Sequence, residues 1–187
     1  MKIGFVIYDG MTTLDFVGVY DPLTRLKTMG FMPDLNWDVC ALSEQVIDST
    51  GLSLKATAVN QPLSKYDLVI VPGGPVSRDL SKDETFIHWI KTMEECPLKV
   101  SVCSGSLILG FVGFLKDKKA TTHPSRMSDL ALYCAKAVSQ RVVDEGSVIT
   151  AGGVTASIDL GLYLCEKLTG YDVKEKIKRQ MDYHGSW

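Results

Sequence analysis

The chain has 187 residues, of which 45% are hydrophobic and 22% charged, and its formal net charge is −2. This composition is that of an ordinary globular protein and excludes extended disorder, and the near-neutral charge excludes a general attraction to nucleic acid or anionic membranes. A membrane-spanning helix is excluded as well, because the longest apolar run, Leu107 to Leu115, is interrupted by two glycines and falls far short of the roughly 20 residues required.

Strands and helices alternate from the start of the chain. Lys2–Tyr8 predicts a strand, and Thr13–Met29 predicts a helix with Gly30 just beyond its end. Pro22 lies inside this helix, so we expect a kink or a break near Tyr20–Asp21. The elements expected next are a strand over Trp37–Leu42, a hairpin or two short edge strands over Val46–Ala58, a buried strand over Asp67–Val71 that stops at Pro72–Pro75, and a helix over Asp83–Glu94.

The second half of the chain continues the alternation. Its expected elements are a buried strand over Leu98–Val102, a helix over Ser104–Leu115, a short strand over Ala120–Thr122, a helix over Ser125–Ala135, hairpin strands over Arg141–Val143 and Val148–Thr150, and helices over Thr155–Leu168 and Val173–Met181. Buried strands alternating with helices predict an α/β fold with a mostly parallel central sheet and helices on both faces. We expect residues 1–187 to form one domain.

Ligands of such sheets bind beyond the carboxyl ends of the strands. This rule selects three loops, which are Asp9–Asp15, Gly73–Gly74 and Cys103–Ser104. No dinucleotide-binding glycine motif and no phosphate-binding P-loop occurs in the chain. The sequence therefore does not indicate a dinucleotide or nucleotide phosphate as the ligand.

Cys103 is the strongest candidate for chemistry. The strand Leu98–Val102 runs directly into this cysteine, which small residues and a helix follow, as in the nucleophile elbow of hydrolases. A helix N-terminus favours the thiolate, so we expect a pKa below the ordinary value. The alternative interpretation is a buried structural cysteine. We adopt that alternative for the other four cysteines, Cys40, Cys96, Cys134 and Cys165.

The cysteines also bear on metals and compartment. Five is an odd number, and no pair has the C-x-x-C spacing, so neither a disulfide framework nor a zinc site is indicated. The apolar run Ile3–Tyr8 ends at Asp9, too early for the apolar segment of a secretory signal peptide. These features predict a cytoplasmic protein.

Five further residues are candidates. Asp15 either exchanges a proton with Cys103 or is a first-turn helix residue. Gly73 and Gly74 allow a backbone amide to face the site, and the amides of Gly74 and Ser104 are expected to form an oxyanion-hole-like pair. His123 is either a base for Cys103 or a polar surface or capping residue of its loop.

Several motifs together resemble the ThiJ/PfpI superfamily. They are Leu14-Asp15 after the first strand, Val71–Gly74, Val102–Ser106, Lys119–His123 and Ile149–Asp159. The resemblance covers nearly the whole chain. It implies a flavodoxin-like sandwich with a cysteine at the elbow and a homodimer with the site near its interface.

Within the superfamily the chain is most similar to isocyanide (isonitrile) hydratases and to the effector domains of AraC-type regulators. The hydratase resemblance implies conversion of R–N≡C to an N-formamide without a cofactor. Cys103 would attack the isocyanide carbon, Asp15 would handle the proton, and a thioimidate would be hydrolysed. The hydratases have threonine where Ser104 stands. Ser104 keeps the hydroxyl, and the difference between the two residues bears on substrate fit.

Other branches of the superfamily define the alternatives. The PfpI-type proteases have histidine at the position of Ser104, so protease activity is disfavoured, and no downstream H-x-E motif indicates a glutamine amidotransferase. A glyoxalase- or deglycase-like enzyme remains a second interpretation. The third is a non-catalytic domain that binds an effector or senses oxidative stress through the Cys103 thiol.

Overall fold

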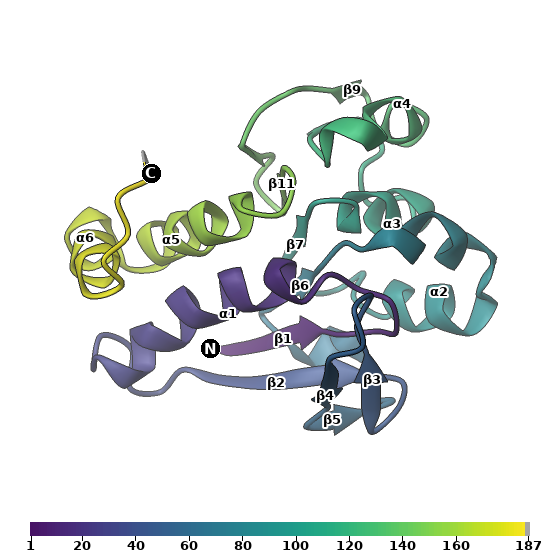
Figure 1. Ribbon diagram of the computed structural model, residues 1–187. Helices are drawn as coiled ribbons and strands as arrows, with labels where there is room; N and C mark the ends of the chain where they lie inside the picture. The colour runs from purple at the N-terminus through teal and green to yellow at the C-terminus, as the bar shows by residue number, and fades with distance from the viewer. Residues whose placement is uncertain (186–187) are drawn as a thin grey trace.

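Seven strands form the central sheet in the order β10-β11-β7-β6-β1-β2-β5. The computed structural model describes residues 1–185 of the chain (Figure 1). The strands of this sheet are β1 (Lys2–Val6), β2 (Asn36–Ala41), β5 (Ala58–Val59), β6 (Leu68–Val71), β7 (Leu98–Val102), β10 (Val142–Asp144) and β11 (Val148–Ala151). All neighbouring pairs are parallel except β10 and β11, which form an antiparallel hairpin. The expected mostly parallel sheet is confirmed.

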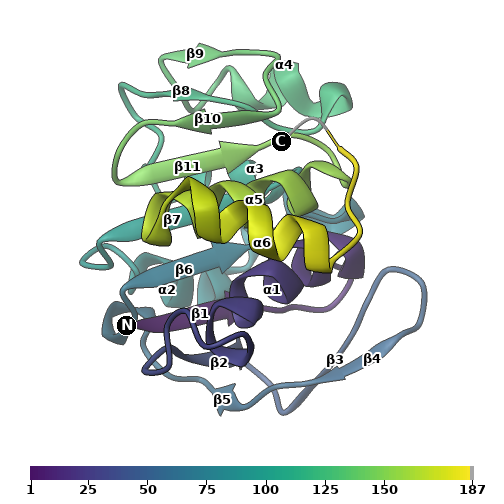
Figure 2. The same cartoon turned by 90° about the vertical axis from the view of Figure 1, so that its left-hand side faces the viewer.

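Two small strand pairs lie outside the central sheet. The segment Val46–Ala58 forms the predicted hairpin, with β3 (Gln45–Ile47) antiparallel to β4 (Ser53–Lys55). This hairpin projects from the body of the protein (Figure 2). The second pair, β8 (Lys119–Ala120) and β9 (Lys136–Ala137), is parallel.

Helices cover both faces of the sheet, as predicted. One face carries α1 (Thr13–Thr28), α5 (Ala156–Thr169) and α6 (Tyr171–Gln180), which pack against one another. The other carries α2 (Glu84–Lys91), α3 (Gly105–Phe111) and the 3₁₀ segment Pro75–Lys82 (Figures 1 and 2). The central strand β6 is apolar on both sides, and all four of its residues are buried. Within residues 1–185, no helix combines the length and hydropathy needed to cross a membrane.

The predicted break at Pro22 does not occur. Helix α1 continues through Pro22, which is buried against α5. A β-carbon at Gly161 of α5 would lie 2.8 Å from Cγ of Pro22, so the two helices meet closely at this point. Packing against α5 therefore outweighs the loss of one helical hydrogen bond.

Two predicted helices are shorter than expected. Helix α3 ends at Phe111 and not at Leu115, because Gly113 adopts a left-handed conformation with φ of 86° that terminates the helix. The segment Ser125–Ala135 contains only a 3₁₀ turn over Pro124–Arg126 and the single turn α4 (Met127–Leu130). After α4 the chain continues into β9, which pairs with β8. These two strands are too short to be recognised from the sequence pattern.

Candidate active site

The three loops selected from the sequence meet at one edge of the sheet, because β7, β6 and β1 are neighbours in it. The amide of Gly73 donates a hydrogen bond to Oδ2 of Asp15 at 3.0 Å. The amide of Gly74 donates to Oγ of Ser104, also at 3.0 Å. These two bonds join the loop after β6 to α1 on one side and to the loop after β7 on the other.

Cys103 occupies a strained turn directly after β7. Its φ of 55° is one of four positive values among the non-glycine residues described. The turn is held on both sides, since its amide donates to the carbonyls of Ala151 and Gly152 at 3.0 Å each, and Oγ1 of Thr122 donates to its carbonyl at 3.0 Å. This is the geometry expected of a nucleophile elbow.

The space beside the Gly73 backbone admits no side chain. A β-carbon there would lie 2.6 Å from the Ser104 nitrogen and 3.0 Å from Oδ2 of Asp15. Any larger residue would therefore separate the Asp15 and Cys103 loops. Gly73 was expected to let a backbone amide face the site, and its amide donates to the carboxyl of Asp15.

Asp15 is fully buried within α1 and lies against Cys103. Among the described residues, no N–H or O–H group reaches its Oδ1 atom. Burial raises the pKa of this carboxyl from its ordinary 3.8 to about 7, although the Gly73 amide and a hydrogen bond with the Cys103 thiol act to lower it. Asp15 therefore changes its charge near neutral pH, beside the candidate nucleophile.

The predicted low pKa of Cys103 is wrong. Burial, and then the negative charge of Asp15, raise the pKa of the thiol to about 11. The backbone amides of Ser104 and Val154 and the Ser104 hydroxyl lower it, but by less. Helix α3 has only seven residues, so its dipole is too weak to offset burial.

The Ser104 hydroxyl belongs to a buried chain of hydroxyl groups. Its Oγ lies 3.0 Å from Oγ of Ser77, which lies 3.1 Å from the Tyr8 hydroxyl. Because Ser104 also accepts the Gly74 amide, that amide is not free to serve in the expected pair with the Ser104 amide. The Val154 amide, whose hydrogen bond lowers the pKa of the Cys103 thiol, is the better candidate for that role.

His123 lies beside the site without a hydrogen bond to Cys103 in the described part of the chain. Its Nδ1 accepts a hydrogen bond from the Ser125 amide at 3.2 Å and lies 2.8 Å from the Ser125 hydroxyl. Its ring covers Gly153, where a β-carbon would lie 2.5 Å from Cδ2. The structure therefore gives His123 the capping role that was one of its two interpretations.

A cavity of about 290 Å³ opens above Cys103. Its lining consists of Thr12, Gly74, Pro75, Cys103, Ser104, His123, Ser125, Arg126 and Val154. Asp15 is not among the lining residues but is hydrogen-bonded to the Cys103 thiol, which is. The volume admits a small molecule, whose reacting atom would meet the thiol first.

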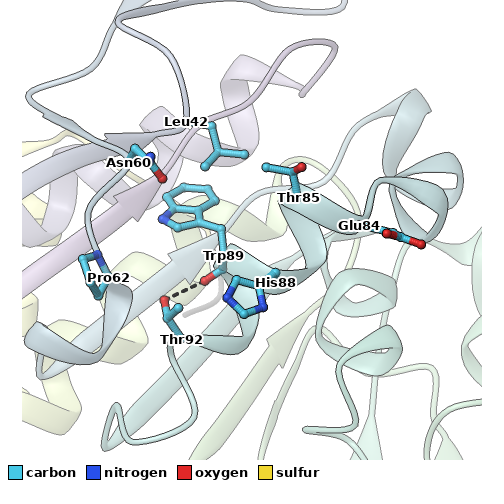
Figure 3. A pocket seen from close by; sticks show the side chains of 8 residues that line it. All are labelled: Leu42, Asn60, Pro62, Glu84, Thr85, His88, Trp89 and Thr92. Atoms are coloured by element: carbon cyan, nitrogen blue, oxygen red, sulfur yellow. Dashed lines mark hydrogen bonds between the residues drawn. The ribbon is translucent and has the colours of Figure 1, made fainter.

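A separate cavity of about 510 Å³ lies beside α2 and contains no cysteine. Figure 3 shows the Trp89 indole at its centre, with Leu42 and Asn60 on one side and His88 on the other. The indole N–H donates to the carbonyl of Gln61 at 2.8 Å. Since the residues between 1 and 185 that line this cavity include no nucleophile with a partnered acid, the candidate active site is the one at Cys103.

Several residues at the site were not predicted. Thr122 and Val154 lie in motifs that carry the family resemblance, so those motifs could have identified them as site residues. Tyr8, Ser77 and Arg126 had none, because each reaches the site through a loop or 3₁₀ turn whose path the sequence pattern does not define. The charge of Arg126 at the cavity bears on substrate choice.

Comparison with known proteins gives one family model and several relatives that match most of the chain. A family model described as the DJ-1/PfpI family matches residues 1–167. The chain is 35% identical over 184 residues to an isonitrile hydratase of Pseudomonas putida, covering 98% of this chain and 78% of that protein. It is 27% identical to the HTH-type transcriptional regulator CdhR of Pseudomonas aeruginosa, covering 94% of this chain and 53% of the regulator.

Solved structures show the same fold. The crystal structure of a ThiJ/PfpI family protein from Pseudomonas syringae superimposes with a TM-score of 0.88 at 29% sequence identity. The match covers 100% of this chain and 76% of that one. The flavodoxin-like architecture is thereby confirmed.

Proposed function

The chain belongs to the DJ-1/PfpI family, and on that premise we propose that it is a cofactor-independent hydratase that converts small isocyanides to N-formamides. The observation that carries the proposal is the pairing of Cys103 with a buried carboxyl whose pKa lies near 7. The similarity to an isonitrile hydratase supports it.

The proposed reaction needs one proton carrier beside the nucleophile. The Cys103 sulfur bonds to the terminal carbon of R–N≡C as the Asp15 carboxylate takes the thiol proton and returns it to that carbon, which yields the thioimidate S–CH=N–R. Water then adds to the thioimidate carbon, its protons pass to nitrogen and sulfur, and the C–S bond breaks. The products are R–NH–CHO and the free thiol, so one water is consumed.

The raised pKa values suit this order of events. A thiol whose pKa is about 11 is protonated at neutral pH and needs a base at the moment of attack. Asp15, with a pKa of about 7, exists in both forms and is able to accept and then return one proton. The amides of Ser104 and Val154 stabilise negative charge at sulfur.

The test is turnover of a panel of small isocyanides, methylglyoxal and other α-keto aldehydes by the purified protein. We expect N-formamide from the isocyanides and none from a Cys103→Ala variant. Turnover of the aldehydes alone would favour the glyoxalase-like alternative. Binding of ligands without turnover would favour an effector-binding domain, an alternative supported by the similarity to the regulator CdhR.

The proposal includes a homodimer. Four large apolar side chains are exposed near the site, which are Leu14 and Val17 on α1 and Ile47 and Leu52 on the β3–β4 hairpin. Oγ1 of Thr13 donates to Oδ2 of Asp48 at 2.6 Å, so the hairpin is attached to the start of α1 and the two groups belong to one surface. A second copy of the chain would cover them.

A further inference from the structure

Two cavities meet at Arg126. The cavity above Cys103 adjoins a polar one of about 540 Å³, and the two share only Pro75 and Arg126 among the described residues that line them. The 3₁₀ turn after His123 positions Arg126 here, with its amide donating to the His123 carbonyl at 2.8 Å. A substrate that reached Cys103 through the polar cavity would pass this side chain.

Arg126 is the single charged residue among the described lining of the Cys103 cavity. Its side chain is 33% exposed, so the guanidinium is partly withdrawn from water and retains strong interactions with an anion. The lining also includes the hydroxyls of Thr12, Ser104 and Ser125, which are neutral.

The positive charge of Arg126 is only partly neutralised. Its Nη1 lies 3.5 Å from Oδ2 of Asp129, and Nη2 of Arg78 lies 4.0 Å from the other oxygen of the same carboxylate. Lys82 and Asp79, the other charged residues of the polar cavity, pair with each other at 3.4 Å. One carboxylate therefore serves two guanidinium groups, and one positive charge is left over at the boundary of the two cavities.

We propose that Arg126 is a specificity-determining residue that binds an anionic group of the substrate, so that the preferred substrates are short isocyanides bearing a carboxylate. This inference rests on the proposed hydratase activity. A planar guanidinium forms paired hydrogen bonds with a carboxylate, whereas the described residues lining the cavity include no acid for a cationic substrate. The anionic end lies at Arg126 and the isocyanide carbon at Cys103.

The test compares two isosteric substrates, a short straight-chain isocyanide ending in a carboxylate and one ending in a carboxamide. The wild type is expected to prefer the carboxylate by about tenfold in kcat/KM, mainly through a lower KM. Arg126→Gln abolishes this preference. Asp129→Asn increases it, because the competing carboxylate is gone. The control Arg179→Gln removes an exposed charge of α6 and keeps the wild-type ratio.

A second readout does not depend on turnover. The corresponding short carboxylate and carboxamide without the isocyanide are tested for protection of Cys103 against iodoacetamide, and about tenfold less carboxylate is expected to give half protection in the wild type but not in Arg126→Gln. Equal protection by both compounds in the wild type would overturn the role of Arg126. Selective protection without turnover of either isocyanide would refute the hydratase proposal and leave the anion site standing.

Discussion

The carboxyl of Asp15 and the thiol of Cys103 occupy one buried volume, where the charge of Asp15 raises the pKa of the thiol while a hydrogen bond with the thiol lowers the pKa of the carboxyl. The pKa of both groups is raised, and the charge of Asp15 is the second cause of the shift at Cys103. The two groups therefore titrate as a coupled pair. Removing the charge of one group changes the pKa of the other, and labelling experiments measure the direction of that change.

Asp15→Asn is expected to accelerate alkylation of Cys103 and to abolish turnover. The neutral amide removes the negative charge that raises the pKa of the thiol, so more thiolate exists at a given pH. It also removes the group that carries the proton to the substrate carbon. The measurement is the rate of iodoacetamide labelling between pH 7 and pH 10, read peptide by peptide by mass spectrometry.

Cys134 is the internal control for that experiment, since it is partly exposed and distant from Asp15 in the fold. Its labelling rate should be the same in the wild type and in Asp15→Asn. Unchanged labelling of Cys103 in the variant would contradict the coupling. Full turnover by the variant would remove Asp15 from the proposed mechanism.

The same substitution is expected to stabilise the protein at high pH. Asp15 binds its proton more tightly in the folded state, so stability is lost as pH rises from the unfolded value of 3.8 through the folded value of about 7. The interval of about 3 pKa units corresponds to about 4 kcal/mol. Asparagine does not titrate, so the gain from Asp15→Asn should grow between pH 4 and pH 8 in urea unfolding and then level off until the Cys103 thiol, with its ordinary pKa of 9.0, begins to titrate in the unfolded chain.

Cys103 and Asp15 were predictable at the residue level because each follows a strand whose carboxyl end must lie at the same sheet edge. The protonation of Cys103 was not predictable. It depends on how deeply the thiol is buried and on the charge of Asp15 beside it, and both follow from tertiary packing. The sequence shows that a helix starts after Cys103. It does not show whether burial or the helix dipole has the larger effect on the pKa of the thiol.

At the level of elements, the elbow between β7 and α3 stores strain. A residue other than glycine with φ of 55° costs about 1 kcal/mol. Cys103→Gly is therefore expected to be more stable than Cys103→Ala by about that amount, although both variants lack turnover. Urea unfolding of the two variants at one pH measures the difference. Alanine being the more stable would show that the turn is relaxed.

Prediction of elements succeeded where burial is continuous and failed where segments are short. The four buried residues of β6 and the run of β7 could belong only to interior strands. The helix expected over Ser125–Ala135 is mostly a 3₁₀ turn and loop, because the residues after Leu130 pair with Lys118 and β8. Such pairing joins parts of the chain that no local pattern connects.

At the level of the whole molecule, strand order explains the site. The chain passes from β1 outward to β2 and β5, returns to β6 and then adds β7, so the first, sixth and seventh strands become neighbours. Residues 15, 73 and 103 meet for that reason. The alternation of strands and helices predicts this layered fold, while the attachment of the β3–β4 hairpin to α1 becomes visible only in three dimensions.

The surface that joins this hairpin to α1 provides the last prediction. Leu14 and Val17 are 41% and 37% exposed, and Ile47 and Leu52 are each 53% exposed. Covering these side chains with a second copy would remove apolar area from water at about 25 cal/mol per Å². We expect light scattering at micromolar concentration to give the dimer mass for the wild type and the monomer mass for Leu14→Lys combined with Ile47→Lys.

The control for the dimer is Leu132→Lys, which introduces a charge at another exposed leucine, 78% exposed, on the far side of α3 from α1. It should keep the dimer mass. Since α1 also carries Asp15, separation of the copies would loosen the helix that positions the carboxyl, so the monomeric variant should lose turnover in parallel with its dimer content. A wild type that is monomeric at all concentrations tested would contradict the interface and leave the chemistry at Cys103 to a single chain.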